Sequence, residues 1–581
     1  MPTVESPEGT VTATVSLSGA DQTLAVALAD RTVVEPSTLG LTAPFDPPTE
    51  DVDLPTVEDF DRSDRTVSET FETTYGKRRE HSHEATESVF VCDFSNGETV
   101  ELTVRASAEG VAYRYRLPET GSVLLFEDQT EFRFPDRTTT WLTPWAENHE
   151  ATSRRAPLFT AEGRYCTPGL FQVADDAWAL VTEAGVDGSY HAASLRSRDQ
   201  TAAVEFEHPW TPVRAKGAFE TPWRVAVVGD LATVVESDLV PALVDGPRFD
   251  PEWVDPGRVA WSWWSESDSP YDPDRQRDYV DYAAERGWEY VLVDEGWSPD
   301  WLPELVEYAA DRGVELFVWA HWTDLHGADE RREKLARWAE WGVAGVKIDF
   351  MDSDEQGRLQ FYDELLADAA ERELLVNFHG SVVPSGLKRR WPHVMTYEGV
   401  MGAEHLKWAT LTPEHNVTLP FTRNAVGAMD YTPVTFSADS RHTSDAHELA
   451  LSVVYESGLQ HFADSIDAYA ARPDAEWFLE RVPAAWDETV FLRGHPGSEA
   501  TIARERDGEW FVGCITAGGA RTVETTLSVL DGDREATLIR DPSGADEADD
   551  DGLVRETVTV GPETPLSVDV PENGGFALYC P

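Results

Sequence analysis

The stretch Gly345-Val-Lys-Ile-Asp-Phe-Met351 has the pattern of a short apolar strand. It presents Asp349 near its end, two residues after Lys347. From residue 249 onward, short apolar segments of this kind alternate with helical ones, as in a parallel sheet with crossover helices. The predicted strands are 259–264, 290–294, 315–320, 345–350, 374–379, 393–397, 417–421 and 459–463. The predicted helices include 278–286, 302–312, 330–341 and 360–372. Eight strands with helices between them predict a (β/α)8 TIM barrel over residues 249–483.

The segments on either side of the predicted barrel have a β pattern. Apolar residues alternate or run together between Gly, Asp and Asn turns, which is typical of antiparallel sandwiches. A large sandwich is predicted over residues 1–248, from the runs 10–17, 23–28, 89–94, 99–104, 111–117 and 223–228. A small C-terminal β-sandwich is predicted over 484–581, from the runs 490–492, 500–504, 510–516, 522–527, 536–539 and 576–580. The acidic stretch 546–551 is predicted to be a surface loop.

The composition describes a large, strongly acidic chain. Its 581 residues are enough for two to four domains, and 107 acidic residues against 47 basic ones give a net charge of −60. At low salt, repulsion among these charges destabilises the compact state. At molar salt the Debye length is only about 3 Å, so the repulsion is mostly screened. We therefore interpret the acidity as the surface of a protein adapted to high salt. It argues against nucleic acid or an anionic membrane as a partner, since both are polyanions.

Cysteine usage and the N-terminal segment narrow the class further. The four cysteines, at positions 92, 166, 514 and 580, lie far apart and contain no CxxC pair. This pattern gives neither a zinc site nor a disulfide framework. The first residues lack the basic and apolar regions of a signal peptide, and no run of about 18 apolar residues suggests a membrane span. These features predict a cytoplasmic protein.

Polar residues gather where the predicted barrel strands end. Because active sites of such barrels lie at the C-terminal strand ends, we interpret this set of residues as the lining of an active site. Any single member could instead be a helix cap or a solvated loop charge. The set consists of Asp294, Asp324, Asp349, His379, Glu398, Glu404, Arg423, Asn424 and Asp464.

Asp349 and Glu404 come from different predicted strand ends and can converge on one pocket. Two carboxylates are the minimal equipment for hydrolysing a glycosidic bond. Lys347 lies on the same face of the strand as Asp349, either as a structural ion-pair partner or as a cation that keeps Asp349 ionised. To act as an acid, Glu404 would have to be protonated at rest. We therefore expect fewer positive charges near Glu404 than near Asp349. Glu150 and Glu398 raise the question of a calcium site, since Ca²⁺ prefers carboxylate oxygens, but their spacing alone is a weak signal.

The chain resembles glycoside hydrolase family 97 over essentially its whole length. Three stretches carry the resemblance, namely 345–351, 397–404 and 420–433, and the stretch 454–460 also fits. The resemblance implies an N-terminal β-super-sandwich, a (β/α)8 barrel and a C-terminal β-sandwich. Retaining members carry an Asp nucleophile in a Lys-x-Asp setting, whereas inverting members lack it and place a base Glu at the end of the fifth strand. Here Asp349 is present and the fifth strand reads Asn377-Phe-His-Gly380, which implies the retaining branch.

The resemblance also implies roles for individual residues. Asp349 becomes the nucleophile and Glu404 the acid/base. Calcium would be bound by Glu398, Glu404 and an N-terminal-domain residue, Glu150, with Glu147 as the alternative. His379 and Asp294 fall where substrate hydroxyls are bound in the family. Lys347, from its own chemistry, could also donate to a substrate hydroxyl.

The function expected from this resemblance is hydrolysis of terminal α-galactosides in an oligosaccharide or glycoside, with retention. The alternatives are an inverting α-glucosidase and a non-catalytic carbohydrate-binding protein. Galactose, glucose and β-L-arabinose are not distinguished by the sequence, and neither is the oligomeric state.

Overall fold

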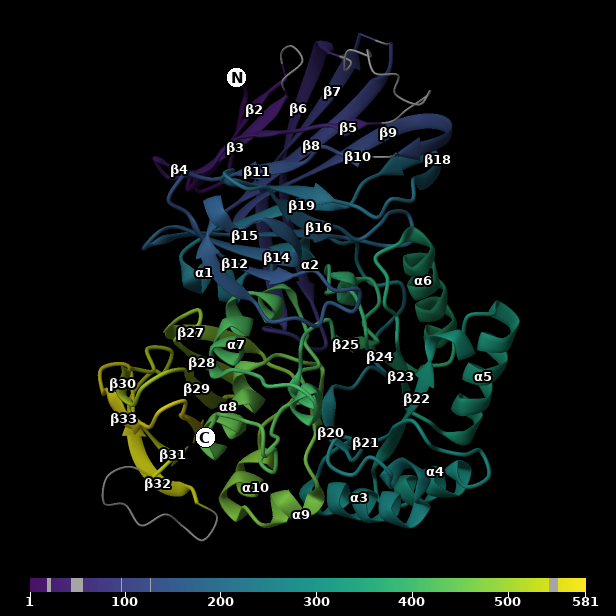
Figure 1. The fold of residues 1–581 in the computed structure, drawn as a ribbon, viewed down its shortest axis with the longest axis vertical. Helices are drawn as coiled ribbons and strands as arrows, with labels where there is room; N and C mark the ends of the chain where they lie inside the picture. Colours follow the sequence, from purple (N-terminus) through teal and green to yellow (C-terminus); the bar gives the residue numbers. More distant parts are fainter. Residues whose placement is uncertain (18–21, 43–55, 96, 126, 543–551) are drawn as a thin grey trace.

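The computed structural model describes residues 1–17, 22–42, 56–95, 97–125, 127–542 and 552–581, and the acidic stretch 546–551 lies outside these residues. A large β domain occupies the top of Figure 1, the barrel lies below it, and a smaller β domain lies beside the barrel. The predicted multidomain fold class is thereby confirmed.

The N-terminal domain is built from antiparallel strands that join into one 17-stranded sheet. A further pair, β5 (Leu41–Thr42) and β10 (Glu127–Asp128), forms a small sheet of its own. The strands of the large sheet are β1 (Thr3–Glu5), β2 (Val11–Ser16), β3 (Thr23–Leu28), β4 (Arg31–Thr38), β6 (Val57–Glu72), β7 (Glu80–Phe94), β8 (Thr99–Ser107), β9 (Gly110–Leu125), β11 (Glu131–Arg133), β12 (Thr139–Pro144), β13 (Arg154–Pro157), β14 (Gly163–Ala174), β15 (Ala177–Ala184), β16 (Ser194–Ser197), β17 (Ala203–Glu207), β18 (Val213–Glu220) and β19 (Trp223–Gly229).

Period-two sequence patterns decide which face of these strands is buried. In β2, Val11, Ala13 and Val15 are fully buried while the residues between them are partly exposed. Because successive side chains of a strand point to opposite faces, these three enter a core that the sheet encloses by folding over on itself. Val104 of β8 and Val181 of β15 belong to the same core.

The barrel sheet has seven parallel strands in the order β25-β24-β23-β22-β21-β20-β26. Helices pack outside it, α3 (Pro273–Arg286), α4 (Leu302–Ala310), α5 (Ala328–Trp341) and α6 (Gln356–Ala370) each following one strand. The strands are β20 (Gly257–Trp261), β21 (Tyr290–Val293), β22 (Glu315–His321), β23 (Gly345–Asp349), β24 (Leu375–Phe378), β25 (Val394–Tyr397) and β26 (Leu459–Phe462).

The prediction of a strand at 417–421 is wrong. Thr412 caps a helix, α7 (Pro413–Thr418), whose first residue is Pro413, and a 3-10 turn, Leu419–Phe421, continues it. Proline at the first helical position favours this start, and a short apolar run does not distinguish a buried strand from a buried helix. The seventh position of the barrel wall is instead bridged by a segment without regular secondary structure. Asp430 N donates to Tyr397 O (2.9 Å) on one side, and Ala463 N donates to Pro433 O (3.3 Å) on the other.

Short helices connect the barrel to the two β domains. They are α1 (Leu231–Glu236) and α2 (Leu239–Ala242) before the barrel, and α9 (Ile466–Ala470) and α10 (Pro473–Leu479) after it. A longer helix, α8 (Asp445–Val454), precedes the last barrel strand, β26. The C-terminal domain pairs a six-stranded sheet with a two-stranded one around its own core. Its strands are β27 (Glu488–His495), β28 (Glu499–Arg506), β29 (Glu509–Thr516), β30 (Arg521–Thr525), β31 (Arg534–Arg540), β32 (Val554–Val560), β33 (Leu566–Val570) and β34 (Gly575–Cys580).

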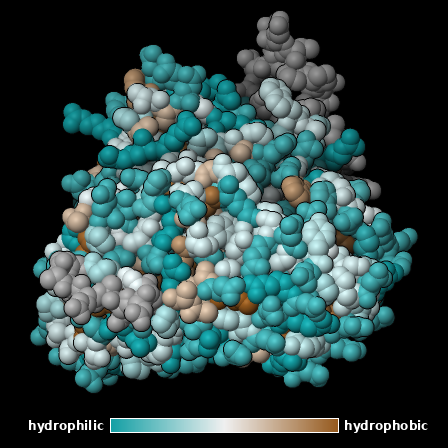
Figure 2. All heavy atoms as spheres, turned by 60° about the horizontal axis from the view of Figure 1, so that its bottom comes forward, coloured by the Kyte–Doolittle hydropathy of each residue, from teal (hydrophilic) through white to brown (hydrophobic). Residues whose placement is uncertain are grey.

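The outer surface is hydrophilic, as the composition predicts. Figure 2 shows one face that is largely hydrophilic, with only scattered hydrophobic residues. Within the described part of the chain, no helix combines the length and the apolar character needed to cross a membrane.

Candidate active site

Asp349 ends strand β23 and is held by two hydrogen bonds. Its Oδ2 accepts from Trp319 Nε1 (3.0 Å), and its Oδ1 accepts from the backbone N–H of Phe350 (2.7 Å). Burial alone would raise the pKa of Asp349, but the charges of Lys347 and His379, together with these hydrogen bonds, outweigh it and hold the pKa below its usual value. The carboxylate is therefore ionised and fixed in direction at neutral pH.

Lys347 forms its ion pair with Asp294 rather than with its strand neighbour. Lys347 Nζ lies 3.0 Å from Asp294 Oδ2, and both side chains are buried. Asp294 also accepts from Trp261 Nε1 (2.7 Å). Alternate strands of a barrel contribute to the same interior layer, so the end of β21 meets Lys347 of β23. The positive charge of Lys347 still lowers the pKa of Asp349.

The end of β25 and the turn after it bring Glu398 and Glu404 to the same pocket. Glu404 lies on the 3-10 turn Ala403–Lys407 and Glu398 directly follows β25. Burial and then the charge of Glu398 raise the pKa of Glu404 to about 8. His379 contacts Glu398, with its Nδ1 3.3 Å from Glu398 Oε2. Its other ring nitrogen, Nε2, lies 2.7 Å from Asp430 Oδ2. Environment thus pushes the pKa values of Asp349 and Glu404 in opposite directions.

Glu150 reaches the site from a loop of the N-terminal domain. Its Oε2 lies 2.7 Å from His405 Nε2. Burial and then the charge of Glu404 raise the pKa of Glu150 to about 8. Glu147 is exposed and its charge acts on Asp352 instead. Of the two candidates, Glu150 is the one that faces the carboxylate group.

A buried anchor holds the Glu150 loop against the barrel. Asp354, in the loop after β23, accepts from Trp145 Nε1 (2.9 Å) and pairs with His149 Nε2 (2.8 Å). Both partners belong to the N-terminal domain. The pocket is therefore assembled from two domains.

The carboxylates suit a hard cation. Ligand atoms of His379, Glu398 and Glu404 all lie within 4.8 Å of one another. Oε1 of Glu398 is buried and has no hydrogen-bond partner among the described residues. Closely spaced carboxylates with an orphan oxygen fit an oxygen-coordinated divalent cation. Glu150 stands outside this closest group.

Sequence reasoning missed several side chains that hold the site. Asp430 is buried and contacts His379, His461 (3.0 Å) and Asn377 (2.7 Å). It lies inside the stretch 420–433 that carries the family resemblance, so that block contained the signal. Trp319, near the end of β22, donates to Asp349. Nothing in the local sequence distinguishes this indole from a tryptophan of the core.

Other polar strand-end residues serve the fold. Asp324 is exposed at the surface. Asp464 accepts from Ser437 and from the backbone of Ser465. Arg423 donates to carbonyls that include those of Tyr397 and Glu398, and Asn424 donates to two others. Arg423 therefore holds the backbone at the end of β25 in place.

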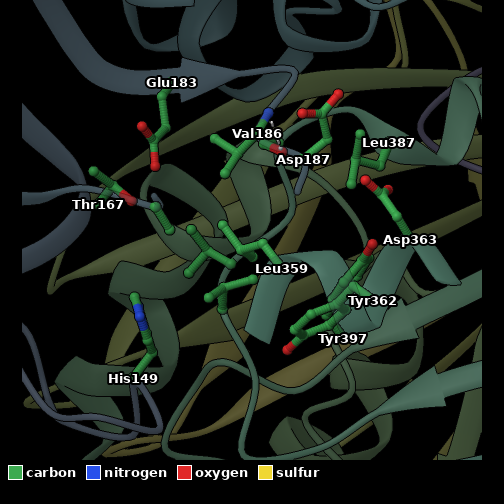
Figure 3. A pocket seen from close by; sticks show the side chains of 14 residues that line it. His149, Thr167, Glu183, Val186, Asp187, Leu359, Tyr362, Asp363, Leu387 and Tyr397 are labelled. Atoms are coloured by element: carbon green, nitrogen blue, oxygen red, sulfur yellow. Dashed lines mark hydrogen bonds between the residues drawn. The ribbon is translucent and has the colours of Figure 1, made fainter. Parts of the chain in front are cut away.

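A separate cavity lies between the N-terminal domain and the barrel (Figure 3). Thr167 and Glu183 line it on one side, and Tyr362, Asp363 and Tyr397 line it on the other. Its volume of about 20 Å³ has room for about one water molecule and not for a sugar. The carboxylate pocket is therefore the candidate site.

The sequence matches three family descriptions in the order of the domains. They are Glycosyl-hydrolase 97 N-terminal over residues 4–245, Glycoside hydrolase 97 over 253–400, and Glycosyl-hydrolase 97 C-terminal, oligomerisation, over 485–580. A "Probable retaining alpha-galactosidase" of Streptomyces bingchenggensis is 42% identical over 576 residues, which cover 96% of this chain and 88% of that one. The chain belongs to glycoside hydrolase family 97. The expected family membership is confirmed.

Two solved structures superimpose on essentially the whole length of this chain. A beta-arabinopyranosidase has a TM-score of 0.91 and 26% identity, with 100% of both chains covered. A Glycoside Hydrolase Family 97 enzyme from Pseudoalteromonas sp. strain K8, in complex with acarbose, has a TM-score of 0.90 and 25% identity, covering 100% of this chain and 99% of that one. This chain is thus a glycoside hydrolase in which the N-terminal, catalytic and C-terminal regions all match the family.

Proposed function

We propose that this glycoside hydrolase is a retaining α-galactosidase acting on the terminal α-galactose of an oligosaccharide or glycoside. The observation that supports it most is the pair of carboxyl groups with opposite pKa shifts, Asp349 ionised and Glu404 protonated. Opposite pKa shifts in two neighbouring carboxyl groups suit one of them, Asp349, to be the nucleophile and the other, Glu404, to be the acid. The 42%-identical relative is named a probable retaining alpha-galactosidase, which supports the same assignment.

The proposed reaction proceeds in two displacements. Asp349 attacks the anomeric carbon while Glu404 gives its proton to the leaving oxygen, which forms a covalent galactosyl–enzyme ester. Glu404, now ionised, takes a proton from water, and the water displaces Asp349. Retention requires the two carboxyl groups to act from opposite faces of the anomeric carbon at a separation of about 5–5.5 Å.

Lys347, Asp294 and His379 are proposed to bind substrate hydroxyls. Lys347 and Asp294 form a buried pair at the bottom of the pocket, and His379 is held between Asp430 and Glu398. Each therefore presents a hydrogen-bonding group whose direction is fixed by its partners. Fixed polar groups of this kind provide specificity in a ligand pocket.

Calcium is the proposed metal, with Glu398, Glu404 and Glu150 as its ligands. Once bound there, it would orient the substrate and polarise the site. The orphan Oε1 of Glu398 supports this choice. So does the burial of Glu150 and Glu404 beside other carboxylates, which raises the pKa of each. Burial alone would lower the pKa of His379, but Glu398 and Asp430 outweigh it and hold this pKa well above its usual value.

The domain boundaries are proposed at 248/249 and 483/484. The family matches that end at 245 and start at 485 support them. Adaptation to high salt and a cytoplasmic location also stay predictions. The description of the C-terminal family domain supports self-association through residues 484–581.

Proton NMR of aryl α-galactoside hydrolysis, in molar salt with calcium, tests the function. Release of α-galactose as the first anomer is the expected result. First appearance of β-galactose would contradict the role of Asp349 as nucleophile.

Parallel assays with aryl β-L-arabinopyranoside and aryl α-glucoside define the sugar. The first matters because a beta-arabinopyranosidase shares the fold, and the second because α-glucosidase is the main alternative within the family. Preference for either over the galactoside would overturn the proposed specificity, and hydrolysis of none of the three would favour a binding protein.

A further inference from the structure

Six large hydrophobic side chains are conspicuously exposed among the described residues, and three of them follow barrel strands. Tyr271 comes after β20, Phe350 directly after β23, and Trp408 after β25. Their position at the C-terminal strand ends places them on the side of the barrel where substrate enters.

Trp408 stands out because a neighbouring network fixes its orientation. Its side chain is 58% exposed, yet its Nε1 donates to His405 Nδ1 (3.0 Å). The other nitrogen of His405 lies against Glu150. The indole is thus tied to the carboxylate pocket by one hydrogen-bonded link.

A second contact supports the Trp408 ring from the side. Its centroid lies 6.4 Å from that of Trp263 in an edge-to-face arrangement. Trp263 is stacked on Trp261 and lies 3.9 Å from Lys407 Nζ, which also donates to the Trp263 carbonyl (2.9 Å). An aromatic ring held in this way pays little entropy on binding a ligand.

The chemistry of the site determines which part of the substrate meets Trp408. Nucleophile and leaving group lie on opposite faces of the anomeric carbon, so the residue that protonates the leaving oxygen lies on the leaving-group side. Glu404 is proposed as that residue, and Trp408 lies only four positions further along the same turn. The exposed indole therefore borders the space into which the aglycone extends.

We propose that Trp408 is a specificity-determining residue that binds the leaving group of the substrate. Resting on the proposed function, this assigns the preferred substrates as α-galactosides whose aglycone is a second sugar. The apolar C–H face of a pyranose packs on a flat indole, and the polar rim of the sugar stays in water.

The test compares substrates with and without a sugar aglycone. For Trp408→Ala, we expect kcat/KM for an α-1,6-linked galactosyl-glucose to fall about tenfold, near the upper limit for one aromatic contact. Hydrolysis of α-galactosyl fluoride, which has no aglycone to stack, should change less than about twofold and also reports that the variant is folded. Trp408→Phe keeps a ring but loses the N–H, so it should retain most activity on the disaccharide.

Trp210→Ala is the matched control, since that indole is 98% exposed in the N-terminal domain. It should leave both substrates unaffected. An equal loss on both substrates with Trp408→Ala would overturn the inference, because it would mean that Trp408 acts only by holding His405. An unchanged disaccharide rate would overturn it as well. Failure of the unaltered enzyme to hydrolyse galactosyl fluoride would instead contradict the proposed function.

Discussion

Replacement of Asp354 by alanine should release the loop that carries Glu150. Asp354 is 4% exposed and accepts from Trp145 (2.9 Å) and His149 (2.8 Å) across the domain boundary. A hydrogen bond to a charged group contributes about 1.5–3 kcal/mol. Loss of both therefore costs about 3–6 kcal/mol.

The functional consequence follows from the population of the docked loop. Each 1.4 kcal/mol changes an equilibrium about tenfold, so the ratio of docked to released loop falls by about 100-fold or more. Since Glu150 then leaves the vicinity of Glu404, we expect kcat/KM on an aryl α-galactoside to fall by at least about 100-fold once the released state predominates. Hydrogen exchange of residues 145–150 should speed up in parallel, while the far-UV circular dichroism stays unchanged.

A double-mutant cycle separates this route from a general loss of stability. If Asp354 acts through Glu150, the Asp354→Ala/Glu150→Ala pair should be no less active than the worse single variant. Asp300→Ala serves as control, since Asp300 is exposed. Unchanged exchange in 145–150 together with activity within about threefold of the unaltered enzyme would refute the reasoning.

The remaining predictions concern chemistry, pH and salt. Asp349→Ala should lose hydrolysis by about 10⁴-fold or more, and added azide should restore turnover with β-galactosyl azide as product; rescue that gives the α-azide would contradict a direct displacement. Because Glu404 must be protonated to act and its pKa is raised to about 8, kcat/KM should fall as pH rises through about 8 in the metal-free enzyme. Calcium should move this alkaline limb to lower pH, since a nearby cation favours the ionised carboxylate; a limb that does not respond to calcium would argue against Glu404 as a ligand. Dilution from molar to 0.1 M salt lengthens the Debye length from about 3 to about 10 Å, so the midpoint of thermal unfolding and the activity should both drop, and full activity in dilute buffer would argue against salt adaptation.

The sequence by itself determined the order of the domains and most of the barrel. Short apolar runs that end in charged residues, such as 345–349, have few structural alternatives when helices separate them. Asp349 and Glu404 were predictable as a pair for the same reason, since both follow such runs. The segment 417–421 was not, because an apolar run of that length fits a buried helix equally well, and the capping by Thr412 decided it.

Only the tertiary structure decided which groups meet. Lys347 pairs with Asp294, 53 positions away, because alternate strands share a layer inside the barrel. Asp430 joins two histidines from different strand ends, and Asp354 docks a loop from more than 200 positions earlier. Local sequence patterns report the period of one element at a time. The opposite pKa shifts of Asp349 and Glu404 depend instead on charges that folding brings together from the ends of β23, β24 and β25.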